Sequence, residues 1–347
     1  MKTVDSAFFI CDNSRMKTTS LVFSLILITI VSQADPLPSK PPVPVDNPMS
    51  AVKVELGKKL FFDPRMSKDG SISCNSCHNV MSGGDDNKST SVGVDAKHGG
   101  RSAPTVWNAA FMSVQFWDGR AKSLEEQAKG PLTNPVEMAM ENHASVVARI
   151  QAIPGYVEEF KSAFPKEIKT EKDITIDHFA KAVASYERTL ITPNSAYDQY
   201  MKGNKKAMSV AAVRGLGIVQ SVGCTSCHMG VNFAGPTLPE GTGFFQKFPV
   251  YPGSEYEAKY ELSKDIGKAG TWRVPTWRNI ALTAPYFHNG RVKTLEEAVK
   301  VMAKTQLNKE LLVKEVNDIV AFLESLTGQF PEQKMPKLPA SSGSTFF

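Results

Sequence analysis

The sequence predicts an all-α protein with long irregular loops, built as two tandem units of related sequence. Segments 143–152, 176–190 and 310–326 each carry apolar residues at the spacing of one helix face. The stretch from Ala51 to Leu60 predicts a further helix. No run of alternating polar and apolar residues indicates a strand, whereas an internal repeat indicates a duplication.

The repeat aligns residues 104–128 with residues 275–299 without gaps, at a constant offset of 171 residues. In each copy Ser123 or Thr294 stands three residues before a glutamate, which is the pattern of a capping box and predicts a helix start. The joint between the units is predicted near residues 190–195. The matched pairs include Pro104/Pro275, Thr105/Thr276, Asn108/Asn279, Phe116/Phe287, Gly119/Gly290, Arg120/Arg291, Leu124/Leu295 and Glu126/Glu297.

Residues 1–34 predict a cleaved signal peptide whose start is Met16, because the apolar run 21–31 has the length of a signal core and is too short to span a bilayer. A short membrane anchor and a buried strand are the alternatives. The signal peptide would direct export, and its cleavage after Ala34 would leave no membrane span. Residues 35–50 are rich in proline and predict an extended arm, and residues 339–347 predict a loose tail.

The charge balance argues against one class of partner. The formal net charge is +5, and no basic patch is interleaved with aromatic residues, so we expect no nucleic-acid partner.

Two Cys-x-x-Cys-His motifs carry the chemistry: Cys74–His78 and Cys224–His228. The only other cysteine, Cys11, would leave with the signal peptide. The motif is that of covalent c-type haem attachment, in which two thiols meet the vinyl groups and the imidazole binds iron. Zinc, a redox-active dithiol and structural disulfides are the alternatives. Because each pair is followed by histidine in an exported chain, we expect two haem c groups, one in each unit.

The repeat predicts that the two irons differ on their second side. After Thr294, Met302 shares a helix face with Leu295, Ala298 and Val299, so it is a candidate thioether ligand to the second iron; ordinary core packing is the alternative. The equivalent residue of the first unit is Pro131, which cannot bind iron.

Near Pro131 the first unit instead offers Glu137, with Gln127 in the preceding helix. A carboxyl group beside an open iron could move a proton between the oxygens of a peroxide. The alternative is that Glu137 is an exposed loop carboxylate and that Met138 or Met140 binds the iron.

Residues 51 to about 338 resemble the bacterial dihaem cytochrome c peroxidases. The stretches that carry the resemblance are LGKKLFFDPRMS, CNSCHNV, GGDDNKSTSVG, APTVWNAAF, QFWDGRAKSLEEQAKGPLTNPVEM, VPTWRNIALTAPYFHNG and TLEEAVKVMAKTQL. The resemblance implies two tandem cytochrome c-like domains, with a peroxidatic haem in 51–192 and an electron-transfer haem in 193–338. It implies reduction of hydrogen peroxide in the periplasm, with a small cytochrome c or cupredoxin as electron donor, and homodimers are common in the family.

The resemblance also implies roles for single residues. His78 would hold the peroxidatic haem, and His228 with Met302 the electron-transfer haem. Glu137 and Gln127 would act on the peroxide, and Trp117 would lie between the haems as an electron relay. A calcium ion would lie at the domain interface, bound partly by the backbone carbonyls of Thr283 and Pro285.

Two positions depart from the family pattern. The family's displaceable distal histidine follows the T-S-x-G tetrapeptide, where this chain has Val94. Either His98 replaces it or the iron needs no reductive opening, and we favour an iron that is five-coordinate or water-bound at rest. The asparagine near the calcium is Ser102 here, and its hydroxyl is a shorter and weaker ligand.

Three other functions remain as alternatives. A purely electron-transferring dihaem cytochrome would have both irons fully ligated. A similar dihaem enzyme that oxidises a partner protein's tryptophans to a quinone would carry tyrosine in place of Met302. A redox sensor would need an accessory domain, and none is visible in the sequence.

Overall fold

The computed structural model describes residues 34–264 and 270–341. All of the predicted signal peptide except Ala34, and most of the predicted tail, lie outside the described residues. Within them the protein is mostly helical and contains little sheet, which agrees with the predicted fold class. None of its helices in this part is both long and apolar enough to cross a membrane.

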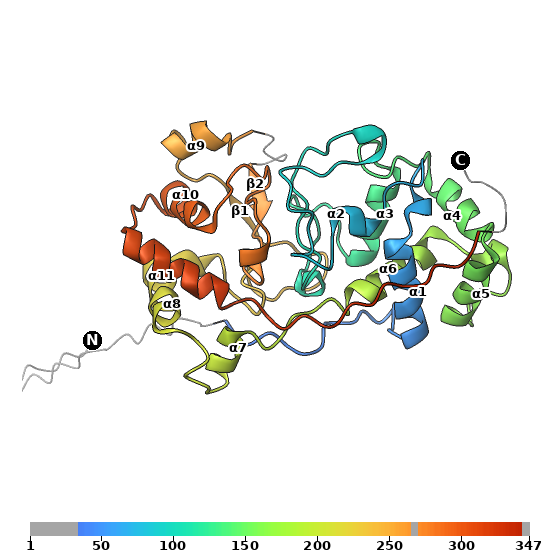
Figure 1. Cartoon of the computed structure of the whole chain (residues 1–347), viewed down its shortest axis with the longest axis horizontal. Helices are drawn as coiled ribbons and strands as arrows, with labels where there is room; N and C mark the ends of the chain where they lie inside the picture. The colour runs from blue at the N-terminus through green and yellow to red at the C-terminus, as the bar shows by residue number, and fades with distance from the viewer. Residues whose placement is uncertain (1–33, 265–269, 342–347) are drawn as a thin grey trace, which may run out of the picture. The chain divides into compact units, whose positions relative to one another are not determined.

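The first half holds six helices among the described residues, and the predicted helices at 51–60, 143–152 and 176–190 are among them (Figure 1). Ser50 caps α1 by accepting from the backbone N–H of Lys53, at 3.3 Å. Helix α6 packs on both α1 and α3, and Gly57 lets α1 pass against the backbone of α6 at Ala182. The helices are α1 (Ala51–Phe62), α2 (Cys74–Cys77), α3 (Leu124–Thr133), α4 (His143–Gln151), α5 (Pro154–Ala163) and α6 (Ile176–Glu187).

The second half repeats this plan with α8 packed on α11, which is the helix predicted within 310–326. Gly215 of α8 lies against the backbone of α11 at Asp318, as Gly57 lies against α6. Each half has its own apolar core. The helices are α7 (Ala196–Met201), α8 (Val210–Val222), α9 (Glu255–Tyr260), α10 (Leu295–Leu307) and α11 (Val313–Glu324).

Short 3-10 turns lie in the loops of both halves. Those at Ala109–Phe111 and Ile280–Leu282 occupy equivalent points of the repeat. The turns are η1 (Pro64–Met66), η2 (Val94–Ala96), η3 (Ala109–Phe111), η4 (Glu171–Asp173), η5 (Cys224–Ser226) and η6 (Ile280–Leu282).

The backbone follows the sequence repeat closely. Phe116 and Phe287 both adopt a positive φ, of 67° and 70°, which is rare for a bulky residue. Helices α3 and α10 begin at equivalent residues, where Ser123 and Thr294 accept from the backbone N–H three residues on. The capping boxes are only half formed, because the carboxylate of Glu126 accepts from the N–H of Lys122 and that of Glu297 from the hydroxyl of Tyr260.

A small antiparallel sheet departs from the predicted helix-and-loop pattern. Strands β1 (Phe245–Lys247) and β2 (Thr271–Arg273) pair in the longer segment that separates the second Cys motif from the repeat. Each strand has only three residues, which is too short for polar alternation to be seen in the sequence.

The proline-rich arm, residues 35–50, has no regular secondary structure, and parts of it are buried. The N–H of Leu37 donates to Asp198 of the second half at 3.0 Å. Asn47 donates to Glu125 of the first half at 2.6 Å. The arm therefore spans the two halves and contributes buried residues to both.

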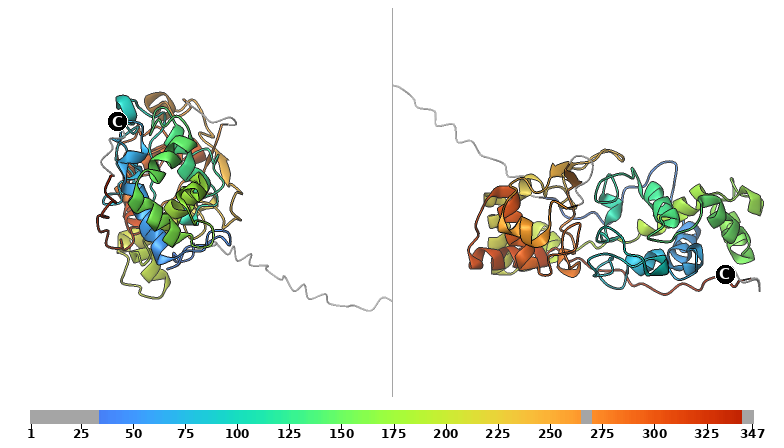
Figure 2. Two further views of the ribbon diagram at one scale, coloured as in Figure 1. Left: turned by 90° about the vertical axis from the view of Figure 1, so that its right-hand side faces the viewer. Right: turned by 90° about the horizontal axis from the view of Figure 1, so that it is seen from above.

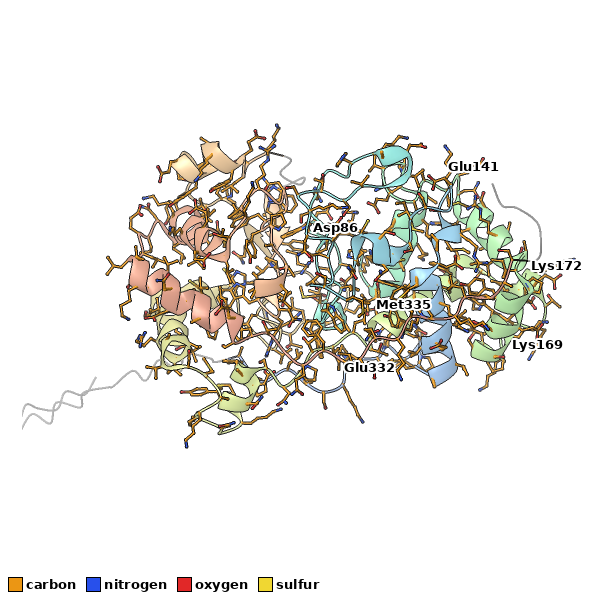
Figure 3. The ribbon with its side chains drawn as sticks, in the orientation of Figure 1. Asp86, Glu141, Lys169, Lys172, Glu332 and Met335 are labelled. Atoms are coloured by element: carbon orange, nitrogen blue, oxygen red, sulfur yellow. The ribbon has the colours of Figure 1, made fainter. Side chains whose placement is uncertain are left out.

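The C-terminal segment also connects the halves. After α11 it returns along the first half, where Gln333 accepts from the hydroxyl of Tyr186 at 3.0 Å (Figures 1 and 2). Glu332 and Met335 mark its course in Figure 3. Ser341, near the start of the predicted loose tail, accepts from Arg65 at 2.9 Å. This end of the chain is therefore attached to the first half, although it follows the second half in sequence.

Candidate functional site

Both Cys-x-x-Cys-His motifs form a single helical turn. In the first, α2 spans the two cysteines and the N–H of His78 donates to the carbonyl of Cys74 at 2.9 Å. In the second, η5 begins at Cys224 and the N–H of His228 donates to the carbonyl of Cys224 at 3.1 Å. Among the described residues none of the four thiols is joined in a disulfide. Each turn thus presents two thiols and one imidazole together, as covalent haem attachment requires.

The two imidazoles are held in the same tautomer, each by a backbone carbonyl group. Nδ1 of His78 lies 3.0 Å from the carbonyl oxygen of Pro104, and Nδ1 of His228 lies 2.9 Å from that of Phe233. A carbonyl can only accept, so Nδ1 carries the proton and the lone pair of Nε2 remains for a metal. Loss of hydration lowers the pKa of both rings, and that of His228 to about 4, which keeps them neutral.

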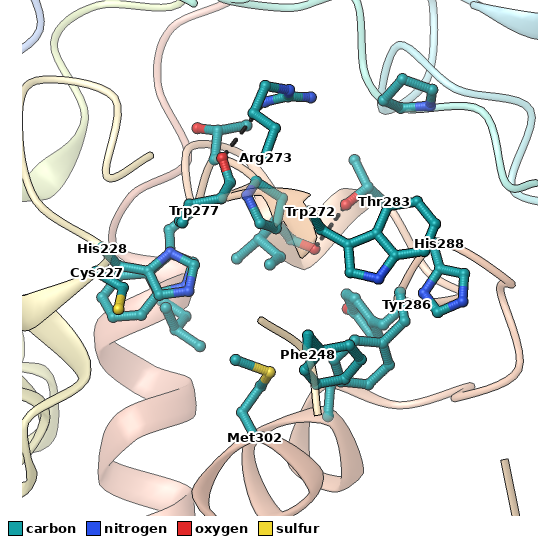
Figure 4. Close-up of a pocket in the computed structure, with 18 of the residues that line it drawn as sticks. Cys227, His228, Phe248, Trp272, Arg273, Trp277, Thr283, Tyr286, His288 and Met302 are labelled. Carbon is teal, nitrogen blue, oxygen red and sulfur yellow. Dashed lines mark hydrogen bonds between the residues drawn. The ribbon is translucent and has the colours of Figure 1, made fainter. Parts of the chain in front are cut away.

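A large cavity lies beside the second motif. Its wall includes Cys224, Cys227 and His228 on one side and Met302 of α10 on another. Figure 4 shows the thioether of Met302 and the ring of His228 directed into the same space. Two thiols, a neutral imidazole and a thioether around an apolar cavity fit a haem c with His and Met axial ligands.

The cavity extends to residues of the first copy, among them Trp117. The indole N–H of Trp117 donates to the carbonyl of Ser102 at 2.9 Å. Its ring meets those of Trp272 and His288 edge-on, with centroids 6.5 Å and 6.4 Å away. Trp272 in turn stacks on His288 at 4.4 Å. Trp117 therefore belongs to an aromatic cluster that reaches across both copies.

Sequence reasoning does not find Trp272 or Trp277, which both line this cavity. Trp272 lies on β2, outside the repeat, and carries no pattern of its own. Trp277 lies inside the repeat, opposite Val106 of the first copy, so the alignment contained a signal for it.

Glu137 lies on the loop after α3 and is half-buried. Asn134 donates its side-chain amide to the Glu137 carboxylate at 2.6 Å. Burial raises the pKa of Glu137. Burial raises the pKa of the thiols of Cys74 and Cys77, and nearby carboxylates raise it further: Glu187 and then Glu137 for Cys74, and Asp86 and then Glu137 for Cys77. Glu137 is thus close enough to the first motif to act electrostatically on it.

The remaining residues predicted for the first motif are placed differently from one another. Gln127 is half-buried on α3, within the helix that leads to Glu137. His98 is exposed, pairs with Val92 in an isolated β-bridge, and has Nδ1 3.4 Å from the hydroxyl of Thr90. Val94, at the family's usual histidine position, is buried, and its N–H donates to the carbonyl of Glu137 at 2.9 Å.

The residues predicted near calcium line the same cavity as Trp117, and so does a carboxylate that the sequence does not single out. Ser102, Thr283 and Pro285 are joined there by Asp85, which is 3% exposed. Oδ1 of Asp85 is buried and has no hydrogen-bond partner among the described residues. Burial raises the pKa of Asp85 to about 7. An unpaired buried carboxylate is unfavourable unless a proton or a cation neutralises it.

Comparison with known proteins gives one consistent result. Residues 51–206 match the family model of the di-haem cytochrome c peroxidases. The chain is 45% identical over 302 residues to the cytochrome c551 peroxidase of Pseudomonas aeruginosa, covering 86% of this chain and 85% of the relative. It is 43% identical over 310 residues to the cytochrome c551 peroxidase of Nitrosomonas europaea, covering 88% of each chain.

A solved structure agrees. A MauG-like protein associated with microbial copper homeostasis superposes with a TM-score of 0.71 at 29% identity, covering 84% of this chain and 95% of that one. The family implies two haem c groups, and its cytochrome c peroxidases are oxidoreductases. This chain therefore belongs to the di-haem cytochrome c peroxidase family and is a peroxidase.

Proposed function

We propose that this chain reduces hydrogen peroxide to water in the periplasm, with electrons from a small c-type cytochrome or a cupredoxin. The observation that carries the proposal is the difference between the two motifs. Met302 faces the cavity beside His228, whereas the first motif has the half-buried carboxyl group of Glu137 in its electrostatic range. Such a difference suits one iron for electron transfer and leaves the other accessible to an oxidant.

In this proposal each domain holds one haem, and the two haems have different roles. Residues 51–192 hold the peroxidatic haem on Cys74, Cys77 and His78. Residues 193–338 would hold the electron-transfer haem through Cys224, Cys227 and His228, and the thioether of Met302 would bind the same iron and favour its reduced form. When bound, the haem irons supply peroxide binding and the two electrons that the reduction of one peroxide consumes.

The protein's own groups supply proton handling and positioning at the first motif. Glu137 takes a proton from one peroxide oxygen and delivers it to the other, so that water can leave. Asn134 holds the Glu137 carboxylate by its hydrogen bond of 2.6 Å, which orients the oxygen that carries the proton. Gln127 adds an amide that can hydrogen-bond the peroxide. In this proposal no protein ligand has to leave the iron first, and the exposure of His98 with its contact to Thr90 supports this.

Trp117 is the proposed relay for electrons between the haems. It comes from the first copy and lines the cavity that contains the second motif. Its indole is fixed by the hydrogen bond to Ser102 and by edge contacts with Trp272 and His288. A rigid aromatic group between two redox centres shortens the gap that an electron must cross.

A calcium ion is proposed at the interface of the two copies. The carbonyls of Thr283 and Pro285 would bind it as the family resemblance implies, and Asp85, which lines the same cavity, would supply a carboxylate. The unpaired Oδ1 of Asp85 supports this assignment, because calcium prefers oxygen ligands and neutralises the buried charge.

The protein is also proposed to form a homodimer, as the family resemblance implies.

Titration of the purified protein with peroxide tests the function. The oxidised and half-reduced forms are compared, following the haem absorption bands and turnover with reduced cytochrome c. We expect peroxide to perturb one haem and to be consumed at the cost of two reduced cytochromes. Two irons that both ignore peroxide would leave only an electron-transferring cytochrome. Oxidation of tryptophans in a partner protein, without cytochrome turnover, would favour the quinone-forming alternative.

A further inference from the structure

The ring of His228 is stacked face to face on an indole. The centroids of His228 and Trp277 are 4.2 Å apart and the ring planes differ by 17°. Trp277 also contacts two other rings. It stacks on Phe233, with centroids 5.6 Å apart and an interplanar angle of 22°, and meets Phe322 edge-on, with centroids 6.2 Å apart. Trp277 is 8% exposed and His228 is 7% exposed. The imidazole therefore has one face covered by a buried aromatic group.

Phe233 contacts both His228 and Trp277. Its backbone carbonyl accepts from Nδ1 of His228 at 2.9 Å, while its ring packs on Trp277. The hydrogen bond alone would leave the imidazole able to swing about the bond to its Cβ atom. The stack adds a second constraint, because any such swing would have to displace an indole that is packed on Phe233 and Phe322.

The first copy lacks this feature. The residue equivalent to Trp277 is Val106, and no aromatic ring is stacked on His78 in the part of the chain that the structure describes. Nδ1 of His78 donates to the carbonyl of Pro104, a residue without an aromatic ring, whereas the carbonyl that accepts in the second motif belongs to Phe233. The duplicated units thus differ at the histidine side of the two haems as well as at the opposite side.

We propose that Trp277 is a positioning residue for His228, which fixes the plane of the axial imidazole, excludes water from its face, and so raises the reduction potential of the second haem. The inference rests on the proposed attachment of haem to Cys224, Cys227 and His228. Oxidised haem iron carries one more positive charge than reduced iron, so water near the ligand favours the oxidised form. Removing the indole should therefore lower the potential.

Potentiometric titration and electron paramagnetic resonance of the haem-loaded, full-length protein test the proposal. In Trp277→Leu, which fills space without a ring, and in Trp277→Val, which copies the first unit, we expect the ratio of reduced to oxidised second haem at a fixed potential to fall roughly tenfold, or about 59 mV for one electron. We also expect the low-spin resonance lines of that haem to broaden. Trp277→Phe should retain most of the original potential and line width.

Phe160→Val is the control, because Phe160 is a buried aromatic residue of the first half that stacks on Phe164 and does not line the cavity beside His228. It should weaken thermal stability without moving the potential of the second haem. An unchanged potential and unchanged lines in Trp277→Leu, with both haems attached, would overturn the inference. Absence of haem from Cys224 and Cys227 in the unmodified protein would instead overturn the proposed function.

Discussion

Asn108 and Asn279, which occupy equivalent positions in the two copies of the repeat, both donate their side-chain amides to Oγ1 of Thr192, each at 2.8 Å. All three residues are fully buried. The side-chain oxygen of Asn108 accepts from the N–H of Thr192, and that of Asn279 accepts from the N–H of Gly328. The predicted joint at 190–195 is thus a buried hydrogen-bonded centre at which both copies and the C-terminal segment meet.

The close crossing of α8 and α11 gives the first prediction. A Cβ atom on Gly215 would collide with the backbone carbonyl of Asp318, so the two helices would have to separate. We expect Gly215→Ala to destabilise the protein by about 2 kcal/mol, which is within the range of overpacked cores. The measurement is denaturant unfolding of the purified protein.

Gly217, two residues along the same helix, is the control for that substitution. A Cβ atom there would meet no heavy atom within 4 Å. Gly217→Ala should therefore be neutral or stabilise by about 0.5–1 kcal/mol through helix propensity. Equal losses of stability in both variants would show that the crossing at Gly215 is not the cause.

Glu137→Gln gives the second prediction, which concerns catalysis. Glutamine retains the shape of the side chain but cannot exchange a proton, so turnover should fall by roughly a hundredfold or more. The measurement is the steady-state rate with reduced cytochrome c. The control is Glu141→Gln, which alters an exposed carboxylate four residues further on and should leave turnover unchanged. Normal turnover in Glu137→Gln would remove this residue from the mechanism.

Glu187 of α6 gives the third prediction, which concerns pH. It is 5% exposed, its Oε2 has no hydrogen-bond partner within the described ranges, and burial raises its pKa to about 8. Between about pH 4.5 and pH 8 the folded state holds a proton that the unfolded state has lost. The free energy of unfolding should therefore fall as pH rises through this window, by up to about 1.4 kcal/mol per pH unit.

Unfolding of the parent protein and of Glu187→Gln at pH 5, 6.5 and 8 measures this effect. Other groups also titrate, so the quantity that matters is the difference between the two proteins. The advantage of the variant should grow with pH, whereas Glu171→Gln, an exposed control, should follow the parent. A constant difference would mean that Glu187 is charged in the folded protein throughout this range.

The sequence predicted local features of the fold well. The helices at 51–60, 143–152, 176–190 and 310–326 follow from apolar spacing, and the equivalent starts of α3 and α10 follow from the repeat. The half-formed capping boxes did not follow, because the carboxylates of Glu126 and Glu297 have other partners nearby.

Features that depend on distant parts of the chain could not be predicted in this way. Leu37 and Asn47 are buried only because other segments cover them. At the candidate site, sequence spacing predicts the two motifs and Met302, but not the contacts that depend on distant residues. The buried Oδ1 of Asp85 that lacks a hydrogen-bond partner among the described residues, and the indole stacked on His228, both depend on residues that are far apart in sequence.

Asp85 gives the last prediction, in which two effects have opposite signs. Asp85→Asn removes a charged calcium ligand, so the affinity for Ca²⁺ in calorimetric titration should fall roughly tenfold. With a chelator present, the same variant should unfold at a higher temperature than the parent protein, because an unpaired buried carboxylate has been removed. Asp95→Asn, at an exposed position in η2, should change neither quantity. A variant that keeps the parent's Ca²⁺ affinity would exclude Asp85 as a ligand, and a lower unfolding temperature under chelation would mean that Asp85 has a stabilising partner in the cation-free protein.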